Sequence, residues 1–328
     1  MGGSIEEIER LIAELEEKIE LVKRRTQERG EDRSEAIGAL ETQLQRLLEQ
    51  TYSDPTGWDR TRLARNPKRP FTLDYLRLAF TDFLELHGDR LHGDDGAIVG
   101  GMARLGSQWV TVVGHQKGRD AGERHLRNFG YARPEGYRKA LRLMRLSEKV
   151  GRPILCLVDT PGADCSVTSE QNGISESIAR NLLEMFRLRV PIVIVITGEG
   201  GSGGALGIGI GDRVLMFENA IYSVIAPEGC AAIVWRDARR GAEAAEKLGI
   251  TAQRALEFGI IDEILPEPLG GAHRDYELTA RTLKGALERN LASLAAVPVE
   301  ELLAERYARF RRLGVFLEGA PAPPAGAP

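Results

Sequence analysis

The sequence predicts an α/β protein, because apolar runs typical of strands alternate with helical patterns over most of the chain. Two buried strands are expected at residues 154–159 and 192–197, where aliphatic and β-branched residues follow a proline. A turn that contains glycine follows each run, and a helical pattern follows each turn. Ligands of open α/β sheets bind at the carboxyl ends of the strands. The candidate site is therefore expected at these two turns.

The composition argues against several classes of protein. The 328 residues are 42% hydrophobic and 28% charged, with a net charge of -4, so neither nucleic acid nor a membrane is an expected partner. No uncharged apolar run is long enough to span a membrane and no signal region is visible, so we expect a cytoplasmic protein. Cys156, Cys165 and Cys230 form no CxxC pair, which argues against a zinc ribbon and predicts reduced thiols.

The first fifty residues, 1–50, predict a helical hairpin. Apolar residues recur at alternating spacings of three and four over 4–29 and again after Gly30, as in the seam of packed helices. This seam could be covered within the hairpin or could pack on another chain. Residues 51–70 contain three prolines and are expected to form an irregular connection.

Residues 71–268 are expected to form the core. A helix should begin with Thr72 as its N-cap and end near His87. Strands at 97–105 and 109–114 should form a hairpin that ends at His115, which is either a catalytic base or a structural residue. One more helix is expected to begin at Pro134, and further helices are expected at 174–189, 227–235, 242–247 and 251–258. Further strands are expected at 214–217, 222–225 and 260–265.

Two further segments have a distinctive composition. Basic residues outnumber acidic ones between Lys117 and Lys149, so a local basic surface could receive a phosphate-bearing ligand or an acidic partner. After the core, helical patterns at 276–294 and 300–313 predict a C-terminal helical segment, residues 269–317. Residues 318–328 are rich in proline and alanine and predict a disordered tail.

A glycine-rich stretch after the second buried strand is the central candidate site. It is expected to form a turn that leads into a short buried helix over 205–210. The N–H groups at the start of that helix would lack intrahelical partners and could bind an oxygen that carries negative charge. The glycines of this stretch are Gly198, Gly200, Gly201, Gly203 and Gly204.

Other interpretations of the same stretch are open. Residues 200–204 match the GxSxG pattern of serine hydrolases, although Ser202 lies five residues beyond Thr197 and the only later histidine is His273. A phosphate loop is excluded, because no GK[ST] follows. The glycines could also serve only to let a helix pack closely on the sheet.

Several longer strings, which lie between Arg69 and Arg274, narrow the choice. They are RPFTLDYLRLAF, GDDGAIVGGMARL, GHQKGR, NFGYARPEGYRKALRLM, VDTPGA, GEGGSGGALGIGIGD, YSVIAPEGCA and PEPLGGAHR. Together they resemble the alpha subunits of the bacterial acetyl-CoA carboxylase carboxyltransferase family. The resemblance implies a crotonase-type fold, a spiral of ββα units in which pairs of backbone N–H groups polarise an oxygen.

The resemblance also implies an activity and partners. Enzymes of this family transfer a carboxyl group from carboxybiotin, held on a biotin carboxyl carrier protein, to acetyl-CoA, and so make malonyl-CoA for fatty acid synthesis. The family implies a beta subunit in an α2β2 heterotetramer, and a biotin carboxylase that acts with it. The zinc ribbon belongs to the beta subunit, so no metal is expected in this chain.

Site residues follow from matching the family's motifs. Gly203 and Gly204 are the expected backbone N–H donors of the oxyanion hole. The residues expected to shape the carboxybiotin pocket are Gly200, Gly201, Ser202, Ala205, Gly162 and Ala163.

One loop departs from the family's pattern. After VDTPGA the family has a tyrosine, a proline and a glycine, whereas this chain has Asp164, Cys165 and Ser166, and the difference extends to residue 172. Either the loop tolerates change, or the chain is impaired or takes another substrate. A serine hydrolase that uses Ser202 and a non-catalytic scaffold are the two alternative functions.

Overall fold

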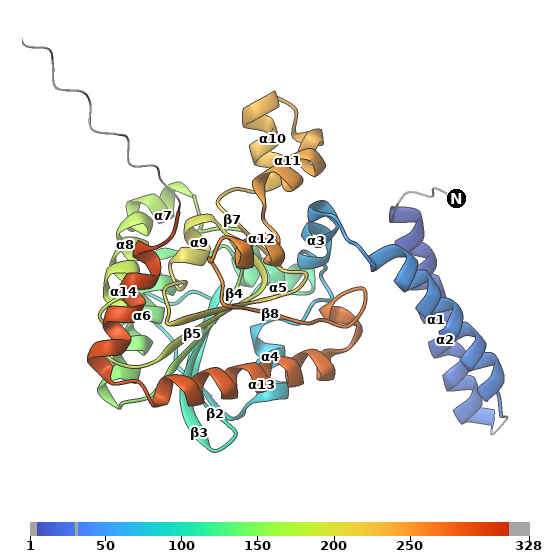
Figure 1. Cartoon of the computed structure of the whole chain (residues 1–328), viewed down its shortest axis with the longest axis horizontal. Helices are drawn as coiled ribbons and strands as arrows, with labels where there is room; N and C mark the ends of the chain where they lie inside the picture. The colour runs from blue at the N-terminus through green and yellow to red at the C-terminus, as the bar shows by residue number, and fades with distance from the viewer. Residues whose placement is uncertain (1–4, 30–31, 315–328) are drawn as a thin grey trace, which may run out of the picture.

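The computed structural model describes residues 5–29 and 32–314, whose strands form one sheet of eight (Figure 1). The strand order is β1-β2-β3-β4-β5-β6-β8, and β7 pairs with the far half of β5. The pairs β1–β2 and β2–β3 are antiparallel, and all later pairs, from β3–β4 onward, are parallel. The bounds are β1 (Thr81–Glu85), β2 (Ile98–Leu105), β3 (Gln108–His115), β4 (Ile154–Thr160), β5 (Ile192–Gly201), β6 (Arg213–Phe217), β7 (Ile221–Ser223) and β8 (Glu263–Leu265).

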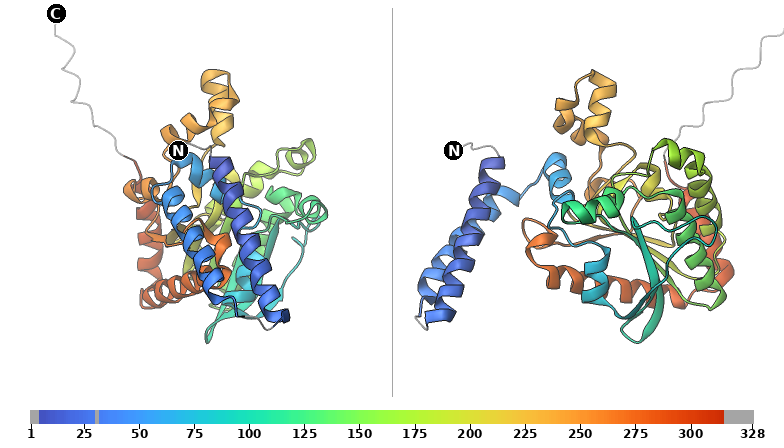
Figure 2. Two further views of the ribbon diagram at one scale, coloured as in Figure 1. Left: turned by 90° about the vertical axis from the view of Figure 1, so that its right-hand side faces the viewer. Right: turned by 180° about the vertical axis from the view of Figure 1, so that it is seen from behind.

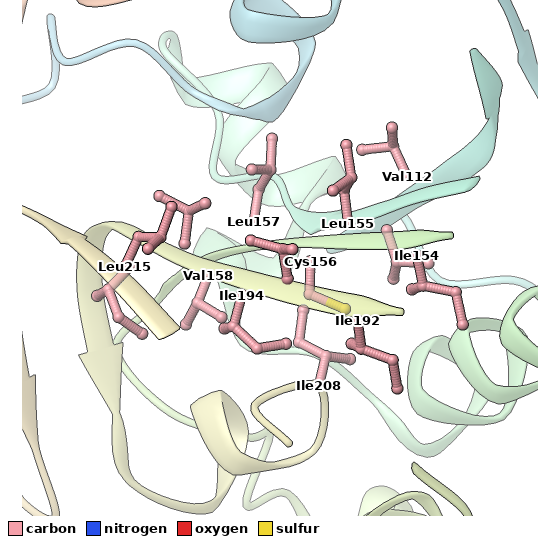
Figure 3. Packing of buried hydrophobic residues seen from close by; sticks show 14 of the residues in the cluster. Val112, Ile154, Leu155, Cys156, Leu157, Val158, Ile192, Ile194, Ile208 and Leu215 are labelled. Carbon is pink, nitrogen blue, oxygen red and sulfur yellow. The ribbon is translucent and has the colours of Figure 1, made fainter. Parts of the chain in front are cut away.

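The two central strands are apolar on both faces, as their sequences predict. Every residue of β4, and of β5 as far as Gly200, is buried. In Figure 3, Leu155 and Leu157 point to one side of the sheet, whereas Cys156 and Ile194 point to the side of Ile208. Because alternate residues of a strand face opposite ways, such a strand is stable only where helices cover both faces.

Helices provide that cover. On one face α6 (Pro134–Lys149) packs on β2 and β3 and on α8 (Ile174–Met185), and on the other α4 (Thr72–Ala79) packs on β2 and α13 (Tyr276–Ala295). Figures 1 and 2 show these two layers from three sides. Within the described residues, no helix is both long and apolar enough to cross a membrane.

The helix expected over 72–87 is shorter than predicted. Phe71, not Thr72, is the N-cap, and α4 ends at Ala79. The chain then turns into β1, which pairs with β2 and places Leu84 opposite Met102. The apolar residues around position 80 therefore belong partly to the helix and partly to an edge strand. Their helical spacing alone does not show where the helix ends.

Other boundaries also differ from the prediction. The connection over 51–70 contains α3 (Gly57–Ala64), which begins with a capping box between Thr56 and Asp59. The helix expected over 174–189 ends at Met185, and the last predicted strand is only Glu263–Leu265. Helices that begin with a proline were placed correctly, at α6 and at α10 (Pro227–Trp235).

The N-terminal helices α1 (Ile5–Arg29) and α2 (Ser34–Tyr52) form the predicted hairpin beside the sheet (Figure 1). Their seam is covered within the chain, because Ile12 packs with Leu48 and Tyr52 of α2. Leu63 of α3 and Leu269 join this cluster. The hairpin therefore docks on the rest of the chain through its own apolar stripe.

The helices α10 and α11 (Gly241–Leu248) project from the body (Figure 1). Trp58 of α3 packs against Gly241 at their base, and the Arg240 guanidinium lies 4.2 Å from the ring centroid of Trp235. As predicted, α11 and α12 (Ala252–Glu257) are followed closely by glycines, Gly249 and Gly259, in the left-handed region.

The remaining helices are short or C-terminal. They are α5 (Ala121–Leu126), α7 (Val167–Gln171), α9 (Ser202–Leu206) and α14 (Val299–Arg311). The boundaries at 50, 70, 268 and 317 stay predictions, and the expected tail, 318–328, lies outside the described residues.

Arg306 fixes α14 on the core through a set of buried contacts. Its guanidinium lies 2.7 and 2.8 Å from the two carboxylate oxygens of Asp212. It also donates to the main-chain carbonyls of Met185, Leu188 and Val190 at 2.8 to 2.9 Å. One side chain therefore ties the end of α8 and the start of β5 to the C-terminal helix.

We expect the substitution Arg306→Ala to lower the free energy of unfolding by about 3–5 kcal/mol, because it leaves the buried Asp212 carboxylate without its partner. Urea titration of both proteins measures this difference. Arg311→Ala is the matched control, since Arg311 is exposed on the same helix, and it should change the value by less than about 0.5 kcal/mol. Equal effects of the two substitutions would contradict the role given to Arg306.

Candidate active site

The second buried strand runs through the glycines instead of stopping before them. It continues from Ile192 to Gly201, where Gly200 pairs with Thr160 of β4 on one side and with Tyr222 of β7 on the other. The expected turn at 198 is therefore wrong, and so is the helix over 205–210, because α9 begins at Ser202 and ends at Leu206. The end of β5 therefore pairs with β7, a neighbour that the sequence did not reveal.

This change affects the hydrolase interpretation. Ser202 directly follows the strand and has a left-handed φ of 50°, so the spacing argument against a nucleophile elbow does not hold. Among the described residues, however, no histidine forms a hydrogen bond with Ser202. The hydroxyl therefore lacks the base that a serine nucleophile needs.

Glycine is required here because main chains approach closely, and not because of an unusual φ. A Cβ atom at Gly201 would lie 2.8 Å from the carbonyl oxygen of Thr160, and one at Gly204 would lie 2.5 Å from the nitrogen of Ala163. A Cβ atom at Gly203 would meet no protein atom closer than 3.8 Å. The loops after β4 and β5 are thus packed backbone against backbone, with Gly203 on the open side.

Neighbouring side chains hold this packing in place. The Tyr137 hydroxyl donates to the carbonyl of Gly204 at 3.1 Å, and the Asn181 amide donates to that of Gly207 at 2.9 Å. In the first loop, the N–H group of Gly162 donates to the Thr160 hydroxyl at 3.1 Å. The first N–H groups of a helix have no intrahelical acceptor. Because α9 begins at Ser202, the N–H groups of Gly203 and Gly204 are among them.

The expected site residues fall into two groups. Gly162, Ala163, Gly203, Gly204 and Ala205 gather where the two loops meet, together with Ser202. Gly200 and Gly201 instead line a hollow of about 210 Å³ with Tyr131, Ile221 and Ile225. A second hollow of about 340 Å³ adjoins it and shares the lining residues Arg65, Pro161 and Glu199.

A charged network between these hollows was missed by sequence reasoning. The Lys117 ammonium lies 2.7 Å from both Asp159 Oδ1 and Glu199 Oε2. Arg65 Nε lies 2.7 Å from the other oxygen of Glu199, and Arg65 Nη1 lies 2.6 Å from Glu228. The network joins β4, β5 and α10 with the residues that follow α3 and β3.

Burial and charge act in opposite directions in this network. Burial alone would lower the pKa of Lys117, but the Asp159 and Glu199 carboxylates outweigh it and raise that pKa. Burial would raise the pKa of Glu199, but Lys117 and Arg65 lower it. Both groups are therefore held in their charged forms.

One feature of the sequence could have indicated this network. A carboxylate lies near the end of each buried, otherwise apolar strand, Asp159 in one and Glu199 in the other. Lys117 was instead assigned to a basic surface over 117–149. That expectation is wrong for several residues, because Lys117 and Lys139 are enclosed and paired with carboxylates. Arg138 likewise contacts the buried Asp89.

His115 is a structural residue. Its side chain is fully buried, and burial, followed by the charge of Lys117, lowers its pKa to about 3. Its main-chain carbonyl accepts a hydrogen bond from the Thr72 hydroxyl at 2.6 Å. A neutral imidazole enclosed in the core cannot reach a substrate in either hollow.

The loop that departs from the family's pattern is ordered and contains α7, where no helix was expected. Asp164 Oδ2 accepts hydrogen bonds from the hydroxyls of Ser166 and Ser169 at 2.6 and 2.5 Å. Ser166 is the N-cap of α7 and accepts from the N–H of Ser169. The residues that replace the family's tyrosine, proline and glycine thus form their own capped turn.

Comparisons with known sequences give one consistent result. The family described as acetyl co-enzyme A carboxylase carboxyltransferase-like matches residues 5–314. The acetyl-coenzyme A carboxylase carboxyl transferase subunit alpha of Methylococcus capsulatus is 54% identical over 314 residues, which cover 96% of this chain and 98% of that protein. The protein of the same name from Geobacter sulfurreducens is 56% identical and covers 84% of this chain and 86% of its own.

Solved structures show the same fold at lower identity. Transcarboxylase 12S aligns with a TM-score of 0.56 and 21% identity, covering 73% of this chain and 45% of its own. A Pseudomonas malonate decarboxylase hetero-tetramer, solved in complex with coenzyme A, has a chain that aligns with a TM-score of 0.54 and 19% identity. The alignment covers 67% of this chain and 91% of that chain. The fold is therefore the crotonase-type α/β fold that the sequence predicted.

The Lys117 network predicts a specific pH dependence. The lowered pKa of Glu199 contributes stability that is present above its ordinary pKa of 4.5 and is lost as the pH falls through the folded value. The raised pKa of Lys117 contributes stability that is present below 10.5 and is lost as the pH rises through the folded value. Between pH 5 and pH 8 both contributions are intact.

We expect Lys117→Met to lower the free energy of unfolding by about 3–5 kcal/mol at pH 8, because two carboxylates lose their shared cation. The deficit should be smaller at pH 5, since the uncompensated carboxylate pair takes up a proton more readily than separate carboxylates do. Urea titrations at both pH values measure it. Lys149→Met, at an exposed lysine, is the control. A deficit that is constant with pH would contradict this account.

Proposed function

This chain belongs to the acetyl co-enzyme A carboxylase carboxyltransferase family and acts as a carboxyl transferase alpha subunit; we propose that it does so only with a beta subunit. The observation that carries this conclusion is the 54% identity to such an alpha subunit over nearly the full length of both chains. Hydrolysis at Ser202 and a purely structural role as a scaffold are not favoured by these similarities.

The proposed chemistry uses the main chain at the meeting point of the two loops. When bound, carboxybiotin would supply the carboxyl group that is transferred to acetyl-CoA to give malonyl-CoA. Negative charge gathers on an oxygen during this transfer, and the N–H groups of Gly203 and Gly204 would donate to it. The close packing of Gly204 on Ala163 supports this role, because it fixes the donors before the substrate arrives.

The hollow beside the strand end supports a pocket for the biotin ring system. Gly200 and Gly201 give it a wall without side chains, and Tyr131, Ile221 and Ile225 provide apolar surface. Gly162, Ala163, Ser202 and Ala205 would complete the pocket from the side of the two loops. The glycines fit a flat, largely apolar group that must come close to the main chain.

The exposed face of the projecting helices supports a partner subunit. Val224, Ile233 and Val234 are 77%, 74% and 59% exposed on or next to α10. A beta subunit that packs there would also cover the Arg65 and Glu228 side of the site. We propose an α2β2 assembly in which the beta subunit binds coenzyme A and holds the zinc, with biotin on a separate carrier protein charged by a biotin carboxylase.

The test of this function is the malonyl-CoA-dependent carboxylation of free biotin, measured with this chain alone and with a cognate beta subunit. We expect turnover only in the mixture. Gly204→Ala should lower kcat/KM at least about hundredfold, since losing one oxyanion donor costs about 2.7–4 kcal/mol. Gly38→Ala is the control, because its Cβ atom meets nothing within 4 Å. A stable but inactive complex would contradict the function, and full activity of Gly204→Ala would contradict the assigned donors.

The surface assigned to the beta subunit is tested separately. The double substitution Ile233→Asp and Val234→Asp should raise the Kd for the beta subunit at least about tenfold, because it places charge where apolar area would be buried. Leu278→Asp, at an exposed leucine of α13, is the matched control and should leave the Kd unchanged. Analytical ultracentrifugation gives both values. Equal binding by both variants would exclude this face as the interface.

A further inference from the structure

A third hollow, distinct from the two beside the candidate site, is lined mainly by arginines. Its volume is about 390 Å³ and it lies between α6, the N-terminal part of α8 and the loop over 88–93. Five arginines line it, against two carboxylates, Asp89 and Glu176. The arginines are Arg90, Arg138, Arg142, Arg145 and Arg180.

Three of these arginines are paired within the chain. Arg138 contacts Asp89 at 2.8 Å and Glu135 at 3.1 Å. Arg145 contacts Glu184 at 3.0 Å, and Arg180 contacts Glu176 at 3.1 Å. Because carboxylates compensate the charges of these three arginines, the uncompensated positive charge of the hollow comes from the other two.

The other two arginines, Arg90 and Arg142, have no carboxylate partner among residues 5–29 and 32–314. Arg90 donates to the carbonyl of His87 at 2.9 Å, and Arg142 donates to the carbonyls of Gly88 and His87 at 2.9 and 3.1 Å. Burial and then the positive charge of Arg90 lower the pKa of Arg142, although Asp94 and Asp89 oppose this shift. The two guanidinium groups therefore repel each other, and an anion between them would remove the repulsion.

Arg90 has a backbone conformation that is unfavourable for arginine. Arg90 has a left-handed φ of 64°, which is unfavourable for a residue with a Cβ atom. Asp89 Oδ1 fixes the loop by accepting the N–H groups of Leu91, His92 and Gly93 at 2.8 to 2.9 Å. An arginine in a conformation that suits glycine is more easily explained by its side chain than by the turn.

We propose that this hollow binds a small ligand that carries phosphate groups. Guanidinium groups match phosphate oxygens in charge and in the spacing of their N–H groups, and within the described part of the chain Arg90 and Arg142 form no ion pair. The volume is within the range of small-molecule sites, and Leu91 and Leu141 give the rest of the ligand an apolar contact. The site is separate from the glycine loops, but it adjoins the altered loop, because Arg138 donates to the carbonyl of Asn172 at 3.0 Å.

The experiment is calorimetric titration of the full chain with inorganic pyrophosphate at fixed ionic strength. We expect one saturable site per chain. The decisive variant is Arg90→Gly, which removes the guanidinium and relaxes the backbone at the same time. It should weaken binding at least tenfold while Tm stays equal or rises, a combination that a structural role for Arg90 does not produce.

A second variant and a control keep the test independent of folding. Arg142→Ala should also weaken pyrophosphate binding at least tenfold, whereas Arg254→Ala, at an exposed arginine of α12, should not. Separate titrations with ADP and with coenzyme A then show which phosphate source binds more tightly. Absence of saturable binding, unchanged affinity in Arg90→Gly, or an equal loss in Arg254→Ala would each overturn the proposal.

Discussion

The contact of Lys117 with Asp159 and Glu199 is the constraint on which the candidate site depends. Two carboxylates at the ends of adjacent buried strands would repel each other, and the single ammonium group at 2.7 Å from both removes this repulsion. The N–H of Glu199 also donates to Asp159 at 2.9 Å. The strand ends can therefore lie side by side, and the loops that follow them start from fixed positions.

The main-chain contact between the two loops is a consequence of that arrangement. Gly201 and Gly204 have no space for a Cβ atom, because the first loop occupies it. Their identity matters through the missing side chain, and the groups that we propose as ligand contacts are N–H groups of the backbone. In such a site the sequence acts on the chemistry indirectly, through packing from Tyr137, Thr160 and Asn181.

Local signals in the sequence predicted the parts of the fold that local chemistry decides. Proline at the first helical position marked the starts of α6 and α10, and continuous apolar runs marked β4 and the first half of β5. The end of β5 could not be predicted in this way, because glycines break strands unless a neighbour such as β7 pairs with them. The edge strand β1 was missed for the same reason, since only β2 makes its residues a strand.

The candidate site residues were assigned from motifs more than from physical reasoning, and the assignment stays a prediction. The glycines were found from their pattern, but the Lys117 network joins residues that are far apart in the sequence and depends on tertiary contacts that a single sequence does not show. Arg65 was assigned to an irregular connection, and only the helix α3 brings it to Glu199. Charged residues within apolar runs were the one available indication.

The position of the aromatic residues gives the molecule a built-in optical reporter. Two of its three tryptophans, Trp58 and Trp235, lie at the base and on the surface of the projecting helices, one against Gly241 and one beneath Arg240. The third, Trp109, lies far from them on the β2–β3 hairpin, between Arg104 and Arg152. Indole emission shifts with local polarity, so the intrinsic fluorescence of the chain samples mainly the face on which a second subunit would settle, without any added dye.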